Sequence, residues 1–349
     1  MNLRAVRQSS TGHDQRPSPT TTFWQATQAV ALGLLAAGAI PAAETAPAAG
    51  TVVVPAPQDE AAHWSGRLMV GAYVVRSNSA VNPNLGPKTI AGTNGQADDR
   101  NTMWPAIRGE LAVRFGRDGA EWFARMPLED SGVSGGLRIG TCLGHLEVSG
   151  FYGFEEDVWR QPYQVDQARD RTSRKALGGD AALQRVAGTA FDLAWSLRSI
   201  EIDDDVSGRT WPALARSGLT QTWSMSYTAA AADVSWRPRL AVDRQDLEGR
   251  ASASDGVRTG VAIQAPWRGL VWCLDGEVGF SRHRADHPIF GERRRDVSFR
   301  TTASTTATDV CGCRGITVTV LVGAMAADSN LAFYDETTWL SGVLIGYGF

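Results

Sequence analysis

Five histidines are the side chains of this sequence best suited to acid–base or nucleophilic chemistry. A hydrolase in a membrane would need a serine and a histidine on adjacent strands, with a third group to orient the imidazole. His13 lies in the N-terminal segment, His63 and His145 begin expected strands, and His283 and His287 fall in an expected external loop. None stands beside a serine in the middle of an expected strand, so we expect the chain not to be an enzyme.

Carboxylates near one histidine suggest a different arrangement, that of an aspartate–histidine protease. Asp286, His287 and Glu292 could stand together at the rim of a barrel. Loop carboxylates are more often solvated or paired, however, and Arg293–Arg295 offers partners next to them. The run Asp203–Asp205 is likewise expected at an exposed loop tip. We therefore expect no active site in these loops.

The cysteines predict no metal centre. Cys311 and Cys313 form a C-x-C pair, which alone is not a zinc site. We expect these two thiols to face solvent. Cys142 and Cys273 fall inside strand patterns, where they would be small strand residues. We expect neither a metal nor a cofactor.

Charged residues of both signs recur at every second position in several segments and define the candidate functional surface. Carrying so many charges into a closed interior is costly unless they pair or stay wet. A narrow wetted channel is therefore expected, whereas thorough pairing across the interior would give a plugged, structural barrel. The side chains predicted to line the lumen are Arg108, Glu110, Arg114, Asp192, Arg198, Asp233, Arg237, Arg239, Asp243, Arg258, Asp275, Glu277, Asp296 and Arg300.

The elements that must position these charges are strands. After Trp64 the sequence has no apolar run long enough for a membrane-spanning helix. Apolar and polar residues alternate instead, most clearly over Asp233–Asp243 and Leu270–Ser281. Tryptophans gather near the strand ends, as the aromatic girdles of a membrane barrel require. The pattern predicts an all-β, up-and-down antiparallel transmembrane β-barrel.

The lengths of the connections predict the number of strands. Bacterial barrels have an even number, with short periplasmic turns and long external loops. The strand counts made from the N-terminus and from the C-terminus agree only if one further strand lies at Asp180–Val186. This strand gives a total of about fourteen, with twelve possible. We expect the loops Ser77–Pro105 and Phe154–Arg174 to fold inward and narrow the channel.

Both ends of the chain predict export to an outer membrane. Residues 1–49 combine a charged region, the short apolar run Ala29–Ile40 and small residues, as a secretory signal does. Residues 50–63 form a proline-containing linker, and residues 64–349 form the barrel. At the C-terminus Val343, Ile345, Tyr347 and Phe349 share one face, and such a terminal aromatic strand is the usual signal for the barrel-assembly machinery.

Four segments carry a likeness to a known family, most sharply Asp328–Phe349 (DSNLAFYDETTWLSGVLIGYGF) and also His287–Arg295, Ala187–Thr189 and Trp64–Ser77. They resemble a family of Gram-negative outer-membrane proteins known only as a domain of unknown function. Scarce lysine and asparagine, and the Cys311–Cys313 turn, depart from the pattern. The resemblance implies a barrel and an outer-membrane location, and it supplies no activity.

These observations lead to one expected function and one alternative. We expect a porin-like passive channel for small polar or charged solutes, whose selectivity depends on the lumen charges. A non-conducting structural or surface-interaction barrel with ligand-binding external loops remains the alternative. The expected partners are outer-membrane lipid and lipopolysaccharide, the assembly machinery and small solutes. The net charge of -3 and the absence of a basic tract exclude nucleic acid.

Overall fold

The computed structural model describes residues 63–93, 97–115, 119–126 and 131–349. The predicted signal segment and nearly all of the predicted linker lie outside the described residues. The strands are β1 His63–Ser77, β2 Arg100–Phe115, β3 Ala120–Met126, β4 Gly132–Thr141, β5 Gly144–Trp159, β6 Arg171–Gln184, β7 Phe191–Ile202, β8 Gly218–Tyr227, β9 Ala229–Ala231, β10 Val234–Leu247, β11 Ser254–Trp267, β12 Leu270–Asp286, β13 Arg293–Thr308, β14 Ile316–Ser329 and β15 Glu336–Gly348. The helical turns are η1 Val186–Gly188, α2 Val206–Thr210, η2 Pro212–Leu214, η3 Val310–Gly312 and η4 Ala332–Tyr334.

The strands form one closed antiparallel sheet, because β1 pairs with β15 from Arg67↔Gly348 to Ser77↔Thr338. All other pairs join neighbours in the sequence, apart from β8 and β9, which both pair with β10 in a single register. The break between β8 and β9 falls opposite Pro238, whose nitrogen carries no hydrogen for the ladder. Counted as one strand, β8 and β9 give a barrel of fourteen, which confirms the predicted fold class and strand number.

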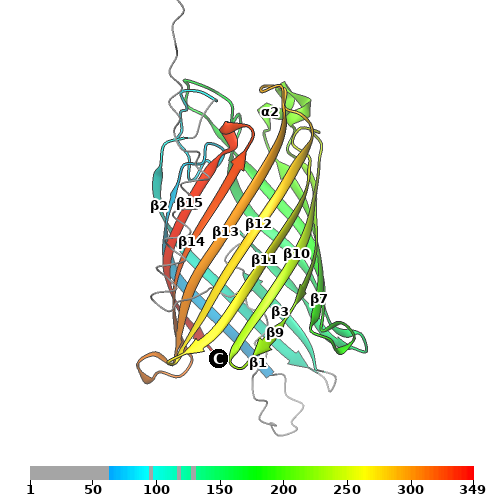
Figure 1. The fold of residues 1–349 in the computed structure, drawn as a ribbon, viewed down its shortest axis with the longest axis vertical. Coiled ribbons are helices and arrows are strands. Elements are labelled where there is room, and N and C mark those ends of the chain that lie inside the picture. Colours follow the sequence, from blue (N-terminus) through cyan, green and yellow to red (C-terminus); the bar gives the residue numbers. More distant parts are fainter. Residues whose placement is uncertain (1–62, 94–96, 116–118, 127–130) are drawn as a thin grey trace, which may run out of the picture. The chain divides into compact units, whose positions relative to one another are not determined.

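Short turns and long loops lie at opposite ends of the barrel (Figure 1). The end that carries the C-terminus has turns such as Arg268–Gly269, and we call it the turn end. The other end, which carries α2, has the long connections, and we call it the loop end. The predicted extra strand exists as β6, but it begins at Arg171. The expected loop Phe154–Arg174 is therefore only 160–170, because β5 continues to Trp159.

Large apolar side chains cover the outer face of the barrel. Their exposed fractions reach 74% at Met103, 63% at Leu177 and 62% at Trp64. So much exposed apolar surface is unfavourable in water but suits a lipid-facing band. Among the described residues, no helix is long and apolar enough to cross a membrane.

One apolar patch lies on the inner face where the barrel closes. Tyr73 packs beside it, and Gly346 leaves the necessary space, since a Cβ there would lie 2.7 Å from Cγ of Met69. The lumen wall is therefore apolar at this patch. The buried members of the patch are Met69 on β1, Ala106 on β2, Leu321 on β14 and Leu344 on β15.

Two positions of single residues differ from expectation. His283 was expected in an external loop, but it is buried within β12. The strand continues past it to Asp286 because the irregular pairing between Arg282 and Asp286 extends the contact with β13. Cys142 was expected in a strand and lies in the β4–β5 turn, whereas Cys311 and Cys313 are exposed, free thiols.

Candidate functional site: the lumen wall and the loop end

A first group of charges lies on β2–β5 and centres on Arg138. Its guanidinium donates to Glu110 at 2.8 Å, to Glu121 at 2.7 Å and to Glu147 at 2.8 Å. Arg125 on β3 reaches the other oxygen of Glu147 at 2.7 Å. Both guanidiniums also lie over the ring of Phe123, at 4.2 Å for Arg138 and 5.2 Å for Arg125. Alternate residues of four strands thus form one network on the inner face, which we call the Arg138 network.

A second group lies nearly opposite in the strand order, on β10–β13, and we call it the Arg239 network. Arg239 forms a two-contact ion pair with Asp275 and donates to Glu277 at 3.2 Å. Arg258 donates to Asp243 at 2.6 Å and to the other oxygen of Glu277 at 3.3 Å. The side chain of Arg239 crosses β11 at Gly260. A Cβ on Gly260 would lie 3.2 Å from the Nε of Arg239. Glycine is therefore the residue that leaves room for this contact.

Smaller pairs on β5–β10 lie between the two networks. Arg198 pairs with Asp180 at 2.9 Å and lies 4.1 Å from the ring of Phe151. Arg237 lies 3.7 Å from Asp192 and donates to Ser226 at 3.0 Å. The ion pairs of the wall join strands that are neighbours or next but one. Their charges are therefore satisfied along the wall.

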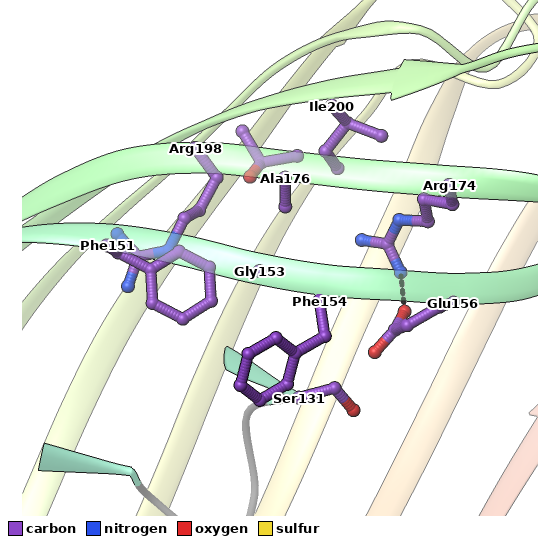
Figure 2. Close-up of a pocket in the computed structure, with 10 residues that line it drawn as sticks. Ser131, Phe151, Gly153, Phe154, Glu156, Arg174, Ala176, Arg198 and Ile200 are labelled. Atoms are coloured by element: carbon purple, nitrogen blue, oxygen red, sulfur yellow. Dashed lines mark hydrogen bonds and ion pairs between the residues drawn. The ribbon is translucent and has the colours of Figure 1, made fainter. Parts of the chain in front are cut away.

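A pocket of about 230 Å³ opens on the inner side of β5–β7. Figure 2 shows Arg198 and Phe151 at one end and the ion pair of Arg174 with Glu156, 3.1 Å long, at the other. Its lining combines two guanidiniums, one carboxylate and apolar side chains. A small polar molecule could rest there within reach of both arginines.

In most wall pairs the arginine is the more exposed partner. In the Arg138–Glu147 pair the side-chain exposures are 29% and 9%, and in the Arg258–Glu277 pair they are 35% and 10%. Glu110, at 37%, is an exception. The accessible wall therefore presents mainly guanidinium groups, with most of the carboxylates behind them.

The register places most of the predicted lumen residues on the inner face, and one in a turn. Asp233 lies in the β9–β10 turn, outside the strands. Arg114 is at the turn end, 3.5 Å from Glu121 and 65% exposed. Sequence reasoning missed Glu121, Arg125 and Arg138, which stand in short or glycine-rich strands. It also missed Glu147 on β5 and Asp180 on β6. The predicted lumen residues that do occupy inward positions of the strands are Arg108, Glu110, Arg114, Asp192, Arg198, Arg237, Arg239, Asp243, Arg258, Asp275, Glu277, Asp296 and Arg300.

The loop end of the barrel is bridged by an aromatic cluster. Tyr163 of the β5–β6 loop contacts Tyr334 of the β14–β15 loop through their hydroxyls, 2.6 Å apart. The Nε2 of His287, from the β12–β13 loop, lies 2.9 Å from the hydroxyl of Tyr334 and 3.2 Å from that of Tyr163. Phe290 and Phe333 pack on the same rings. We call these five residues the loop bridge.

The loops that carry the loop bridge come from nearly opposite sides of the mouth. The β5–β6 and β12–β13 loops are six strands apart in a barrel of fourteen, almost on opposite sides. Fourteen strands about 4.8 Å apart and tilted by about 40° enclose a cylinder roughly 28 Å across. Loops from the two sides meet only if they fold over the lumen. The β5–β6 loop thus narrows the mouth as expected.

Arg169 holds the base of the loop bridge. It is fully buried and donates to the carbonyls of Ala80 at 2.7 Å, Pro162 at 2.9 Å and Pro87 at 2.6 Å. Its guanidinium lies 4.2 Å from the ring of Trp159. Burial lowers the pKa of Arg169 to about 10, so it stays charged near neutral pH. One side chain thereby joins the β1–β2 and β5–β6 loops.

The acidic run of the β7–β8 loop was expected to be an exposed loop tip; Asp203 is exposed, but each of the three aspartates has a cationic partner. Asp205 caps α2 and accepts from Arg216 at 2.7 Å. Asp204 pairs with Arg160, and Asp203 pairs with Lys175 at 3.0 Å. Arg216, Ser207 and the backbone amide of Gly208 hold the pKa of Asp205 below its ordinary value despite its burial. The run serves to fasten the loop.

The two histidines near the loop end have different surroundings. Nε2 of His283 lies 3.7 Å from Asp296, which also accepts from Ser281 at 3.1 Å, and Nδ1 of His283 lies 2.7 Å from the carbonyl oxygen of Ala251. The imidazole of His287 is enclosed by the loop bridge, and its burial, with the charge of Arg294 nearby, lowers its pKa to about 4.

A family model described as "Protein of unknown function (DUF2860)" matches residues 63–348, from the first residue of β1 to the last residue of β15. The chain belongs to this family. The family resemblance predicted from the C-terminal segment is thereby confirmed. No curated protein matches the sequence.

Several solved structures are similar in architecture to this DUF2860 member. An anion-selective porin from Comamonas acidovorans is 8% identical with a TM-score of 0.40, over 83% of this chain and 100% of that chain. The outer membrane channel DcaP of Acinetobacter baumannii is 11% identical with a TM-score of 0.41, over 82% and 97%. OpdK of Pseudomonas aeruginosa, solved with vanillate, is 10% identical with a TM-score of 0.34, over 82% and 98%. Likeness at this level says nothing of a solute.

Proposed function

We propose that this DUF2860 protein is a passive outer-membrane channel for small polar or charged solutes, with a preference for anions. The observation that carries the proposal is the arrangement of the wall charges. The Arg138 and Arg239 networks pair sideways along the wall, and they face each other across the lumen. A closed, charge-plugged barrel would need these pairs to cross it instead. A wet interior suits these charges, because removing even paired charges from water is costly.

The proposed anion preference follows from the greater exposure of the arginine side chains than of their carboxylate partners. The guanidiniums of Arg138 and Arg258 are more accessible than the carboxylates Glu147 and Glu277 that they neutralise. A solute in the lumen therefore meets positive charge first, and guanidinium binds carboxylate and phosphate groups well. The loop bridge leaves only the space around it for entry and so limits solute size.

Liposome swelling tests the channel directly. Liposomes that contain the full protein, purified from membranes, should swell in small uncharged sugars, at rates that fall steeply with sugar size. The matched control is the same protein after heat denaturation. Rates equal to those of protein-free liposomes would contradict the proposal.

The loop bridge also favours a second candidate, a non-conducting barrel with binding loops. In that case its buried Tyr163, Tyr334 and His287 would close the mouth permanently and present a fixed outer surface. Variants that disrupt the bridge separate the two candidates. Only in a channel would they enlarge an existing flux, whereas in a closed barrel they would create one.

A further inference from the structure

The outer face of β10–β13 carries a row of charged residues at the loop end. Arg244 stands opposite Asp255, Asp255 opposite Arg282, and Arg282 opposite Arg295. All four occupy the positions that alternate with the inward lumen residues, so they face away from the lumen.

Two arginines of this row stand side by side without a counter-charge. Arg282 and Arg295 are both exposed and are directly paired in the β12–β13 register. Side chains so paired begin about 5 Å apart, and like charges at that position destabilise a sheet. Neither guanidinium has an ion-pair partner among the residues that the structure describes. Asp255 is opposite Arg282, but its two oxygens accept from Arg284, at 2.9 and 2.7 Å.

The pair lies at the edge of the apolar band. On β10–β13 the next outward row toward the turn end is apolar, with Val242, Val257, Phe280 and Val297 in continuous register, and it meets Asp328 on β14. Phe280 is 53% exposed. From Leu270 to Phe280 the outward face of β12 spans about 26 Å at a usual strand tilt, which matches an apolar band about 25 Å tall. The arginines therefore stand where lipid headgroups begin.

The surroundings are positive on balance. Five arginines and three aspartates face outward at the loop end of these strands, and Asp328 on the neighbouring β14 reduces the difference to +1. Arg244 and Arg284 share Asp246, and Arg293 lies 3.5 Å from Asp286, so the surplus falls on the Arg282–Arg295 pair. These outward residues are Arg244, Arg282, Arg284, Arg293, Arg295, Asp246, Asp255 and Asp286.

We propose that Arg282 and Arg295 bind a phosphate of a phosphorylated glycolipid in the outer leaflet, whose acyl chains lie along Val242, Phe280 and Val297. A phosphate between two guanidiniums removes their repulsion and accepts charge-assisted hydrogen bonds from both. A lipid is the source that fits, because the site adjoins the apolar band. The site rests on the outer-membrane location in the proposed function and does not depend on conductance.

Thermal unfolding of the full protein in detergent tests the site. The added probes are diphosphoryl lipid A, the same lipid A with its phosphates removed, and inorganic phosphate. Only diphosphoryl lipid A should raise the midpoint of wild-type unfolding by several degrees, since a ligand of the native state stabilises it. No rise, or an equal rise with either of the other two probes, would overturn the assignment.

Substitution locates the effect. Arg282→Gln and Arg295→Gln should each weaken lipid A binding about fivefold. Without lipid, each variant should unfold slightly above the wild type, because the like-charge repulsion is gone. Merely structural damage would instead lower the midpoint under both conditions. The matched control is Arg268→Gln, an exposed arginine at the turn end, which should respond to lipid A as the wild type does.

Two results would reject the site outright. Equal lipid responses in the wild type and in Arg295→Gln would show that the pair is not involved. A loss of response in Arg268→Gln as large as in Arg295→Gln would show a general effect of charge. If bilayer recordings are silent while the lipid response holds, the channel alone is rejected.

Discussion

Adjacent residues in the middle of β10 face opposite environments. Leu240 points outward and is 42% exposed, whereas Arg239 points inward and contacts Asp275 and Glu277. One position therefore tests the lipid face and the next tests the lumen, within a single strand.

Leu240→Arg should impair assembly, because a charge on the lipid face near mid-membrane costs roughly 2–4 kcal/mol. The measurement is the fraction of protein that shows heat-modifiable migration on a gel. Leu240→Ile, which keeps the face apolar, is the matched control. Normal assembly of the arginine variant would show that this face does not meet lipid.

Arg239→Leu should fold but shift ion selectivity toward cations. The substitution leaves Asp275 without its partner in the Arg239 network, so the wall gains one net negative charge. The reversal potential under a salt gradient measures the shift. An unchanged potential from a conducting variant would place Arg239 away from the ion path.

Phe349 is the single residue that we expect to matter most for assembly of the barrel in the membrane. It lies on the outer face beside Tyr347, with ring centroids 6.2 Å apart, and it exchanges backbone hydrogen bonds with Gly66 at 3.0 Å. We propose that the assembly machinery recognises Val343, Ile345, Tyr347 and Phe349. Phe349→Ala should reduce assembled protein in cells severalfold, whereas Phe115→Ala, another outward aromatic at the turn end, should not. Equal yields would argue against recognition of the terminal residue.

At the scale of elements, the loops around the mouth depend on one buried cation. Arg169→Ala leaves the carbonyls of Ala80, Pro87 and Pro162 without their donor, at a cost of about 1–3 kcal/mol for each group left unsatisfied. The loop bridge should loosen, which would increase single-channel conductance and noise. Arg250→Ala, at an exposed loop arginine, should leave both unchanged. A conductance equal to that of the wild type would show that the bridge does not limit flow.

The same loops should respond to pH through His287. Its folded pKa of about 4 lies below the ordinary value of 6.5, so the unfolded state binds more protons between these values. Stability is complete above pH 6.5 and is lost as the pH falls toward 4, by on the order of 3 kcal/mol. The groups that face the imidazole are Tyr163, Tyr334, Arg294 and His283.

Conductance should therefore become noisier from pH 7 to pH 5 as the loop bridge loosens. His287→Gln, which cannot be protonated, should remove most of this change in bilayer recordings. A pH response that persists in the variant would assign it to another group.

Element prediction from the sequence succeeded where the two faces of a strand contrast. Leu270–Ser281 alternates sharply, and its strand was found, but β6 was located only by counting. Gly178 and Gly179 place one glycine on each face of β6, so its pattern carries little contrast. Arg138 on β4 was missed for the same reason. The alternation of Glu121 with Trp122 was a usable signal for the Arg138 network.

Contacts between loops could not be predicted. Nothing in the spacing of Tyr163, His287 and Tyr334 shows that they meet, because the closure of the barrel brings them together. The predicted loop position of His283 failed for a related reason, since strand ends depend on pairing with the neighbouring strand rather than on local pattern.

At the scale of the whole molecule, the fold separates three environments. The outer face is apolar, the inner wall carries two charge networks, and the loop end is bridged by aromatic side chains. Closure of the sheet satisfies the backbone without an exposed edge, as a membrane requires. The proposed channel depends on this combination, because sideways pairing would let the wall stay charged while the lumen stays wet.

Planar-bilayer recording of the full protein, purified from membranes, tests that claim most directly. The account predicts discrete, stable conductance steps and a reversal potential under a salt gradient that shows a preference for anions. A correctly folded, heat-modifiable barrel that gives no steps would contradict it and would favour a closed barrel that acts through its loops.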